Sequence, residues 1–383
     1  MQKIVRTSTV ASSLDILVKG QLRFLNQYFE VIAVSGADKH LENVRQREGV
    51  KVHSIPMKRP ISPIQDLISL YRLYAFFRKE KPDIVHSMTP KAGLLSMIAA
   101  RLAGVPIRVH TFTGLIFPSR KGFMQKILIA LDRLLCFCAT QIYPEGQGVK
   151  NDLMRYRITK KPLQIIANGN VNGIDSAYFD PALFSEEYKK QLKSELKITP
   201  EDFTFVCIGR LVGDKGINEL IAAFRKLSAE ITHLKLLLVG PTEPELDPLL
   251  PQTIEEMAHN PNIISVGWQD DIRPYCAISN AMVFPSYREG FPNVVMQAGA
   301  MGLPAIVTDI NGSNEIIKQN TNGLIIPVKD EAAIFNAMEM LLSDKKLYIS
   351  LQKNARELIL SRFEQKLFWQ AILAEYKKLQ SHV

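Results

Sequence analysis

The 383-residue chain contains few cysteines, only two tryptophans and no long uninterrupted apolar segment. Its four cysteines (Cys136, Cys138, Cys207 and Cys276) lie in apolar stretches. Cys136 and Cys138 are two residues apart, so on a helix they would not face a common metal ion. The composition therefore excludes a disulfide-rich secreted scaffold, and we expect four reduced, buried thiols in a cytoplasmic protein.

We also expect no membrane-spanning or targeting segment. The first ten residues lack the apolar run of a signal peptide. The most apolar run, residues 127–139, is interrupted by Asp132 and Arg133 and is shorter than the roughly 20 residues that span a bilayer. The chain contains neither a Walker loop nor a G-x-G-x-x-G motif, and its histidines lack metal-ligand spacing. We therefore expect no metal ion and no bound cofactor.

Charge is distributed unevenly along the chain. Residues 1–180 contain 26 Lys and Arg against 13 Asp and Glu, whereas residues 181–383 contain 21 against 25. A basic half indicates an anionic partner, which leaves nucleic acid, an anionic membrane surface or a phosphate-bearing substrate, or else a merely solvated basic surface. Because no RNA-reading aromatic motif, helix-turn-helix pattern or zinc spacing accompanies the charge, we expect no nucleic-acid partner.

Short apolar segments alternate with amphipathic ones through both halves. Strands are expected at residues 3–7, 29–35, 51–55, 84–87, 107–111, 141–143 and 163–166, then at 204–209, 235–240, 263–266, 281–285, 305–308 and 323–326. Helices are expected at 62–80, 91–103, 218–229, 293–301 and through most of 347–380. This alternation predicts parallel sheets with helices on both faces.

The pattern occurs twice, on either side of a turn-rich stretch at residues 168–181. We expect an α/β protein with two doubly wound, Rossmann-like domains, at 1–180 and 181–360, whose sheets face a central cleft. The remaining helix, 361–383, is expected to pack back on the first domain. Ligands of such sheets bind beyond the carboxyl ends of the strands, so both domains should present those ends to the cleft.

Residues 209–216, with the sequence GRLVGDKG, follow an apolar strand and precede a helix. The glycines permit a tight turn, and Arg210 and Lys215 place two cations beside the N-terminus of the helix. Helix amides, the helix dipole and fixed cations together suit a diphosphate. The alternative is an ordinary turn with surface cations.

A second strand-to-helix junction has the sequence PSYREGFPN, residues 285–293. Pro292 fits the start of a helix. Glu289 could accept hydrogen bonds from sugar hydroxyls, and Asn293 with the following amides could reach a phosphate. Glu289 could equally be only a helix cap.

These strings, together with residues 266–317 and NGLIIPVKD at 322–330, resemble the retaining glycosyltransferases of family 4, which have the GT-B fold. In the first half, residues 81–114 resemble the bacterial subgroup that builds capsular and O-antigen polysaccharides. The resemblance covers nearly the whole chain and implies a hexosyltransferase. The resemblance implies that its donor is a nucleotide-sugar, with UDP as the nucleotide, and that its acceptor is a glycan linked to a lipid diphosphate.

The resemblance also implies roles for individual residues. Arg210 and Lys215 would neutralise the donor diphosphate as it leaves, and His110 would reach the donor sugar. Glu289 would bind sugar hydroxyls. The remaining implied contacts are those of Trp268 and Gln269 with the base, and those of Gly290, Phe291, Pro292 and Asn293 with sugar and phosphate. Without a carboxylate assignable as nucleophile, front-face displacement is the preferred hypothesis over a covalent intermediate.

Two positions depart from the family pattern. The second glutamate, which holds the ribose eight residues after the first, is replaced by Gln297. An amide hydrogen bond lacks the charge assistance of a carboxylate, so a weaker hold on the ribose is expected. The Gly-rich loop near residue 10 is absent, and only Gly20 precedes the next helix.

The first domain is expected to receive the acceptor. Its basic residues would face the acceptor diphosphate or the inner face of the cell membrane, where the protein would bind peripherally; they are Arg6, Lys19, Lys58, Arg59, Lys91, Arg120 and Lys121. The loop at residues 117–123 mixes aromatic and cationic side chains, which suits a membrane interface as well as a flexible surface loop. His86 could contact the acceptor, although a structural histidine is the favoured interpretation. The alternative enzyme is a non-hydrolysing nucleotide-sugar epimerase.

Overall fold

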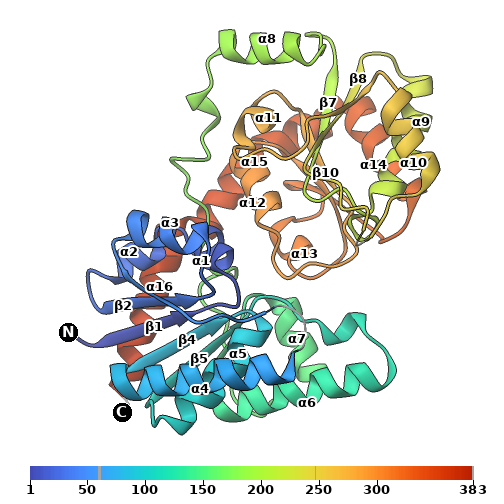
Figure 1. Cartoon of the computed structure of the whole chain (residues 1–383). Helices are drawn as coiled ribbons and strands as arrows, with labels where there is room; N and C mark the ends of the chain where they lie inside the picture. The colour runs from blue at the N-terminus through green and yellow to red at the C-terminus, as the bar shows by residue number, and fades with distance from the viewer. Residues whose placement is uncertain (59–61, 246, 382–383) are drawn as a thin grey trace. The chain divides into compact units, whose positions relative to one another are not determined.

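The computed structural model describes residues 1–58, 62–245 and 247–381 (Figure 1). The chain forms two compact units. The first comprises Met1–Gly173 together with the chain from Gln365 onward, and the second comprises Ile174–Glu364. The polypeptide therefore passes from one unit to the other twice, after Gly173 and again after Glu364.

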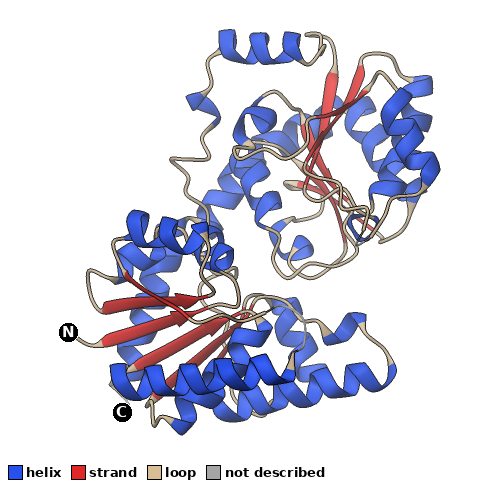
Figure 2. Cartoon of the chain, in the orientation of Figure 1, coloured by secondary structure: helices blue, strands red, loops and turns tan. Residues whose placement is uncertain are grey.

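The first unit contains a six-stranded parallel sheet in the order β3-β2-β1-β4-β5-β6. Its strands are β1 (Lys3–Thr7), β2 (Glu30–Ser35), β3 (Lys51–Ser54), β4 (Ile84–Met88), β5 (Ile107–Phe112) and β6 (Gln141–Pro144). Its helices are α1 (Ala11–Leu17), α2 (Gln21–Leu25), α3 (Lys39–Glu48), α4 (Pro63–Glu80), α5 (Pro90–Leu102), α6 (Gly122–Cys138), α7 (Gln147–Arg155) and α16 (Gln365–Gln380), with a 3-10 turn η1 (Phe117–Ser119). Figure 2 shows the strands between layers of helices.

Successive residues of a strand point to opposite faces of the sheet, and this alternation creates two cores. On β1, Val5 belongs to the core beneath α4, α5 and α6, whereas Ile4 belongs to the core beneath α1, α2 and α16. Trp369 of α16 stacks on Phe24 of α2 with ring centroids 5.3 Å apart. The last helix of the chain therefore completes the core of the first unit.

The second unit repeats this plan with the strand order β12-β11-β10-β7-β8-β9. Its strands are β7 (Phe203–Ile208), β8 (Leu234–Val239), β9 (Ile263–Ser265), β10 (Ala281–Phe284), β11 (Ala305–Thr308) and β12 (Gly323–Ile326). Its helices are α8 (Glu186–Glu195), α9 (Ile217–Glu230), α10 (Pro251–His259), α11 (Arg273–Ala277), α12 (Asn293–Ala300), α13 (Ser313–Ile316), α14 (Glu331–Ser343) and α15 (Lys345–Phe363), with the 3-10 turns η2 (Pro181–Leu183) and η3 (Gly213–Lys215). The order of strands reverses between β1 and β4 in one sheet and between β7 and β10 in the other. These reversals are the switch points where doubly wound sheets bind ligands.

The expected α/β class with two parallel, doubly wound sheets is confirmed. One expected strand, 163–166, is wrong: only Leu163 pairs, in an isolated bridge with Ile142. The chain turns away there, because Gly169 and Asn170 make their backbone bonds to Ile166 and Glu145. Among the described residues, no helix combines the length and the hydropathy needed to cross a bilayer.

Candidate active site

The candidate site lies at the switch point of the second sheet, where the segments after β7 and β10 meet. The amide of Tyr287 donates to the carbonyl of Asp214 over 2.9 Å. Gly216 has φ +70°, and a Cβ there would lie 2.2 Å from the carbonyl oxygen of Pro285. The two motifs found separately in the sequence therefore form one surface, and Gly216 is what allows their close approach.

A third segment, after β8, joins the same edge of the sheet. Gly240 has φ +149°, and a Cβ on it would lie 1.8 Å from the carbonyl oxygen of Gly209. Directly after this close contact of Gly240 with Gly209, the amide of Leu211 donates to the carbonyl of Pro241 over 2.8 Å. The loop that carries Arg210 is thus attached to the segment that begins at Pro241.

Arg210 is held by an acidic side chain from that loop. Its Nη1 donates to Oε2 of Glu243 over 2.7 Å, while 43% of the Arg210 side chain remains exposed. The hydrogen bond to Glu243 raises the pKa of the guanidinium above its usual value, which is partly offset by desolvation. Arg210 is therefore a permanent cation with one edge fixed and a solvent-facing surface.

Lys215 and Glu289 form an ion pair at the junction of the two motifs. Both side chains are mostly buried, and the hydroxyl of Ser286 donates to Oε1 of Glu289 over 3.0 Å. Close by, Nη2 of Arg288 donates to Oδ2 of Asp214 over 2.8 Å. Cation and carboxylate thus stand side by side, as needed to recognise a phosphate and sugar hydroxyls in one pocket.

The segment after Glu289 is fixed by backbone packing. A Cβ on Gly312 would lie 2.3 Å from the carbonyl oxygen of Gly290, and Phe291 is buried against Phe363 at 5.6 Å between ring centroids. Pro292 occupies the N-cap of α12, which begins at Asn293. Gln297 lies one turn further along α12 and is partly exposed on the same face as Asn293.

Trp268 and Gln269 follow β9, the outermost strand of this sheet. The amide of Gly240 donates to the carbonyl of Gly267 over 2.8 Å, which joins their loop to the same edge. Trp268 is 67% exposed and its Nε1 donates to Asp270 over 3.1 Å, while Nε2 of Gln269 donates to the carbonyl of Val266 over 2.8 Å. The Trp268 ring is therefore accessible, and the Gln269 amide is engaged by its own loop.

His110 lies in the first unit, at the carboxyl end of β5, and is 1% exposed. Its Nδ1 is bonded to the hydroxyl of Ser87 at 2.8 Å, and a Cβ on Gly93 would lie 2.4 Å from its Cε1. Burial lowers the pKa of His110 to about 3, so the imidazole is neutral at physiological pH. Its contact with a donor sugar stays a prediction.

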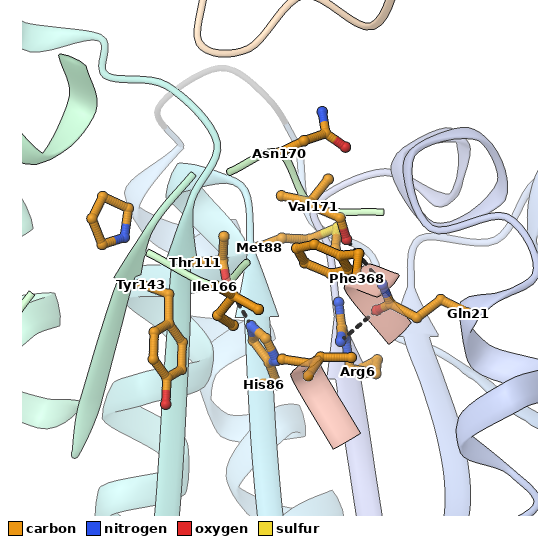
Figure 3. Close-up of a pocket in the computed structure, with 12 residues that line it drawn as sticks. Arg6, Gln21, His86, Met88, Thr111, Tyr143, Ile166, Asn170, Val171 and Phe368 are labelled. Carbon is orange, nitrogen blue, oxygen red and sulfur yellow. Dashed lines mark hydrogen bonds between the residues drawn. The ribbon is translucent and has the colours of Figure 1, made fainter. Parts of the chain in front are cut away.

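The switch point of the first sheet contains a buried polar cluster rather than a basic surface (Figure 3). Arg6 and His86 are register partners on β1 and β4. Arg6 is 2% exposed, and its Nη1 donates to Gln21 over 3.0 Å and to the hydroxyl of Tyr376 over 2.9 Å. The adjoining cavity, of about 10 Å³, has room for about one water molecule.

This cluster corrects one expectation about the basic residues. Arg6 was expected to face an anionic partner at the surface, which is wrong, because it is enclosed by β1, α2 and α16. Lys91 is also largely engaged, by Asp66 at 2.7 Å. The remaining residues of that set, Lys19, Lys58, Arg120 and Lys121, are exposed, and Arg59 lies outside the described residues. His86 is buried and bonded to Tyr376 and Thr111, as expected of a structural histidine.

The four cysteines are free and buried, as expected from their apolar segments. Within the described part of the chain, no three His, Cys, Asp or Glu side chains are grouped to hold a metal ion. Sequence reasoning missed Glu243, which lies four residues after the end of β8, whereas Arg210 lies two residues after the end of β7. Because β7 and β8 are neighbouring parallel strands, the segments that follow them share one edge of the sheet, and an acidic residue in the segment after β8 is the signal that could have identified it.

Most of the chain is similar to known glycosyltransferases. Residues 18–170 match the family described as Glycosyltransferase Family 4, and residues 188–358 match that described as Glycosyl transferases group 1. The chain is 33% identical to the capsular polysaccharide biosynthesis glycosyltransferase CapM of Staphylococcus aureus, over 98% of this chain and 97% of CapM. It is 31% identical to the UDP-Gal:alpha-D-GlcNAc-diphosphoundecaprenol alpha-1,3-galactosyltransferase of Escherichia coli, over 82% of this chain and 81% of that enzyme.

Among solved structures, HepE of Anabaena in complex with UDP and glucose superimposes with a TM-score of 0.81, at 17% identity, over 99% of this chain and 100% of HepE. Two doubly wound units of this kind form the GT-B fold, and the molecule is a GT-B glycosyltransferase. The chain belongs to glycosyltransferase family 4. The comparisons give no support to the epimerase alternative.

Proposed function

We propose that this glycosyltransferase moves a sugar, with retention of anomeric configuration, from a UDP-sugar to a glycan carried on a lipid diphosphate, in the synthesis of a cell-surface polysaccharide. The observation that carries the proposal is the joining of Arg210, Lys215 and Glu289 at the switch point of the second sheet. The acceptor class follows the printed activity of the Escherichia coli relative, whose acceptor is a diphosphoundecaprenol-linked sugar.

In this proposal the donor diphosphate binds between Arg210 and Lys215, near the first turns of α9 and α12. Both cations neutralise negative charge that builds on the leaving nucleotide, an electrostatic contribution that commonly lowers barriers by several kcal/mol. Glu289, fixed by Lys215 and Ser286, accepts hydrogen bonds from sugar hydroxyls. Residues 290–293 shape the sugar and phosphate pocket, Trp268 and Gln269 border the base, and Gln297 binds the ribose.

The reaction itself is proposed to occur by front-face displacement. The leaving phosphate oxygen accepts the proton of the attacking acceptor hydroxyl as the bond from sugar to phosphate breaks. Glu289 is paired with Lys215, so its role in this scheme is to bind the sugar rather than to form a covalent bond. A glycosyl–enzyme adduct detected by mass spectrometry would contradict the scheme.

The first unit is proposed to bind the acceptor and to dock on an anionic membrane surface. Helix α4 carries Ile64, Leu67, Ile68 and Tyr71 at the spacing of a single helical face, and all four are exposed. Ile116, directly before η1, is exposed as well, as are Phe123 and Met124 at the start of α6, and Arg120 and Lys121 lie between them in the sequence. Exposed apolar side chains with flanking cations are what an interfacial segment needs.

The position of these exposed apolar residues also supports an anionic membrane surface as the partner. Helices α4 and α6 pack on either side of α5, so their outer faces belong to one side of the unit. In a right-handed βαβ unit each helix runs antiparallel to its strands, which places the N-terminal turns of α4 and α6 at the carboxyl edge of the sheet. A lipid-linked acceptor bound at that edge would keep its lipid close to the membrane.

The function is tested by a transfer assay. The purified protein, in EDTA, is incubated with each of a set of UDP-sugars and a synthetic polyprenyl-diphosphate-linked N-acetylglucosamine. We expect one donor to give a glycosylated lipid whose new anomeric centre has the configuration of the donor, and the R210A variant to give little product. Epimerised UDP-sugar formed without acceptor, or a product of inverted configuration, would contradict the proposal.

A further inference from the structure

Glu243 is an acidic residue beside Arg210, in the proposed binding site of the anionic donor diphosphate. Its carboxylate is only 2.7 Å from Nη1 of Arg210, and 29% of its side chain is exposed. A free carboxylate at this position would repel a diphosphate. Its pairing with Arg210 removes much of that repulsion and leaves the net charge of the pair near zero.

The geometry of the pair is one-sided. Glu243 accepts from Nη1 of Arg210, whereas Nε and Nη2 have no hydrogen-bond partner in the described part of the chain. A guanidinium has five N–H donors in a rigid plane, so one edge can be bound by a carboxylate while another edge binds a phosphate. Glu243 therefore occupies one edge of Arg210 and leaves donors available for a ligand.

The loop that carries Glu243 is itself fastened to the phosphate loop. Leu211 forms a bridge with Thr242, and the amide of Asp214 donates to Oδ2 of Asp247 over 2.6 Å. Gly213 lies so close to Asp247 that a Cβ would be 2.9 Å from its Oδ1. Thr242 and Asp247, on either side of Glu243 in the sequence, are thus both in contact with the loop that carries Arg210.

We propose that Glu243 is a positioning residue for the donor diphosphate: it orders the Arg210 side chain before the nucleotide binds. An unpaired arginine has many rotamers, and ordering it in advance lowers the entropy cost of binding. Glu243 does not touch the nucleotide and acts only through Arg210. The inference rests on the proposed function, since it presumes that Arg210 binds the diphosphate.

Calorimetric titration with UDP, in EDTA, tests this through a double-mutant cycle of E243A, R210A and the double variant. We expect E243A to weaken UDP binding about fivefold, as for a partly exposed ion pair, and E243Q to retain more affinity than E243A because its amide oxygen still accepts from Nη1. In the R210A background, E243A should cause no further loss. E245A is the matched control, because Glu245 is an exposed acid of the same loop, and it should bind UDP as the wild type does.

The outcomes separate this inference from the proposed function. Unchanged or tighter UDP binding by E243A, losses by E243A and R210A that simply add, or an equal loss in E245A would overturn the role of Glu243 alone. Wild-type UDP affinity in R210A would instead show that the proposed donor site is wrong. Melting temperatures of all variants, measured without UDP, establish that each is folded, and E243Q carries the test if E243A is not.

Discussion

Among single residues, the most informative feature is that the cations of the candidate site are already paired. Arg210 is bonded to Glu243, Lys215 to Glu289 and Arg288 to Asp214. Each pair keeps an arginine or lysine in a defined rotamer while leaving N–H donors for a ligand. A site built this way offers phosphate-binding groups without presenting a large uncompensated positive charge to solvent.

Gln297 gives the first prediction. A carboxylate at this position would accept charge-assisted hydrogen bonds from the ribose hydroxyls, which are roughly twice as strong as neutral ones. We expect Q297E to tighten UDP binding about fivefold, measured by calorimetry. The 2′,3′-dideoxy analogue of UDP lacks those hydroxyls and should show no gain; an equal gain with the analogue would place Gln297 away from the ribose.

Residues whose partners are distant in the sequence could not be placed from the sequence alone. The cation pair Arg210 and Lys215 could be identified because both occupy one strand-to-helix turn, a local pattern. The burial of Arg6 could not, since it depends on Gln21 and on Tyr376, which lies 370 residues away. Glu243 was missed for a similar reason, because its partner belongs to a neighbouring strand of the same sheet.

The helices and strands were largely predictable, because each has a clear period and clear ends. Helix α4 begins at Pro63 directly after Ser62, and α5 ends before Gly104, as the capping residues indicate. The failure at residues 163–166 concerns a short apolar segment whose pairing depends on where the chain turns next. The predicted helical tail is two helices, α15 and α16, separated at Glu364.

Helix α4 carries the prediction at this scale. Replacing Ile64, Leu67 and Tyr71 together by serine removes apolar surface that is exposed in the protein, so stability should change little while binding to vesicles falls several-fold. The measurement is co-sedimentation with vesicles containing phosphatidylglycerol, at low and at high salt.

A matched control replaces Ile254 and Ile349 by serine, two exposed apolar residues of the second unit. This control should bind vesicles as the wild type does. Undiminished binding by the α4 variant, or equal binding to neutral vesicles, would contradict the proposed membrane contact.

On the scale of the whole molecule, the chain builds the same six-stranded plan twice and returns to the first unit with its last helix. The duplication could be predicted from the repeated strand–helix alternation. The chain returns to the first unit at Gln365 because Phe368, Ile372 and Tyr376 supply part of its core. No local pattern specifies which core an amphipathic terminal helix joins.

The first unit should lose stability in acid. His86 and His110 are buried in the first unit, where burial lowers both pKa values, that of His110 to about 3. Unfolding lets each bind a proton below its ordinary pKa of about 6.5, so the free energy of unfolding falls as the pH decreases from there. The carboxyl group of Asp132 has the opposite effect between roughly pH 4 and 7 and offsets the contribution of one histidine. Burial raises its pKa to about 7, so the folded protein binds a proton there that the unfolded chain does not. The two histidines act together against one carboxyl group, so the net effect of acid on the first unit should be a loss of stability.

Urea unfolding of W268F at pH 6 and pH 5 measures this effect, because Trp369 in the first unit is then the only tryptophan. Replacing both histidines by glutamine should reduce the difference between the two pH values. A first unit that is equally stable at both would show that these imidazoles are not held neutral by burial.

The central claim is that the switch point of the second sheet binds a nucleotide diphosphate through Arg210 and Lys215 without a metal ion. Calorimetric titration of UDP in EDTA tests it most directly, on the wild type, R210A, K215A and, as a matched control, the exposed cation variant K226A. The account predicts saturable binding by the wild type and K226A, and a loss of at least tenfold in R210A and in K215A. Binding that requires added Mg²⁺, or that persists unchanged in R210A and K215A, would contradict it.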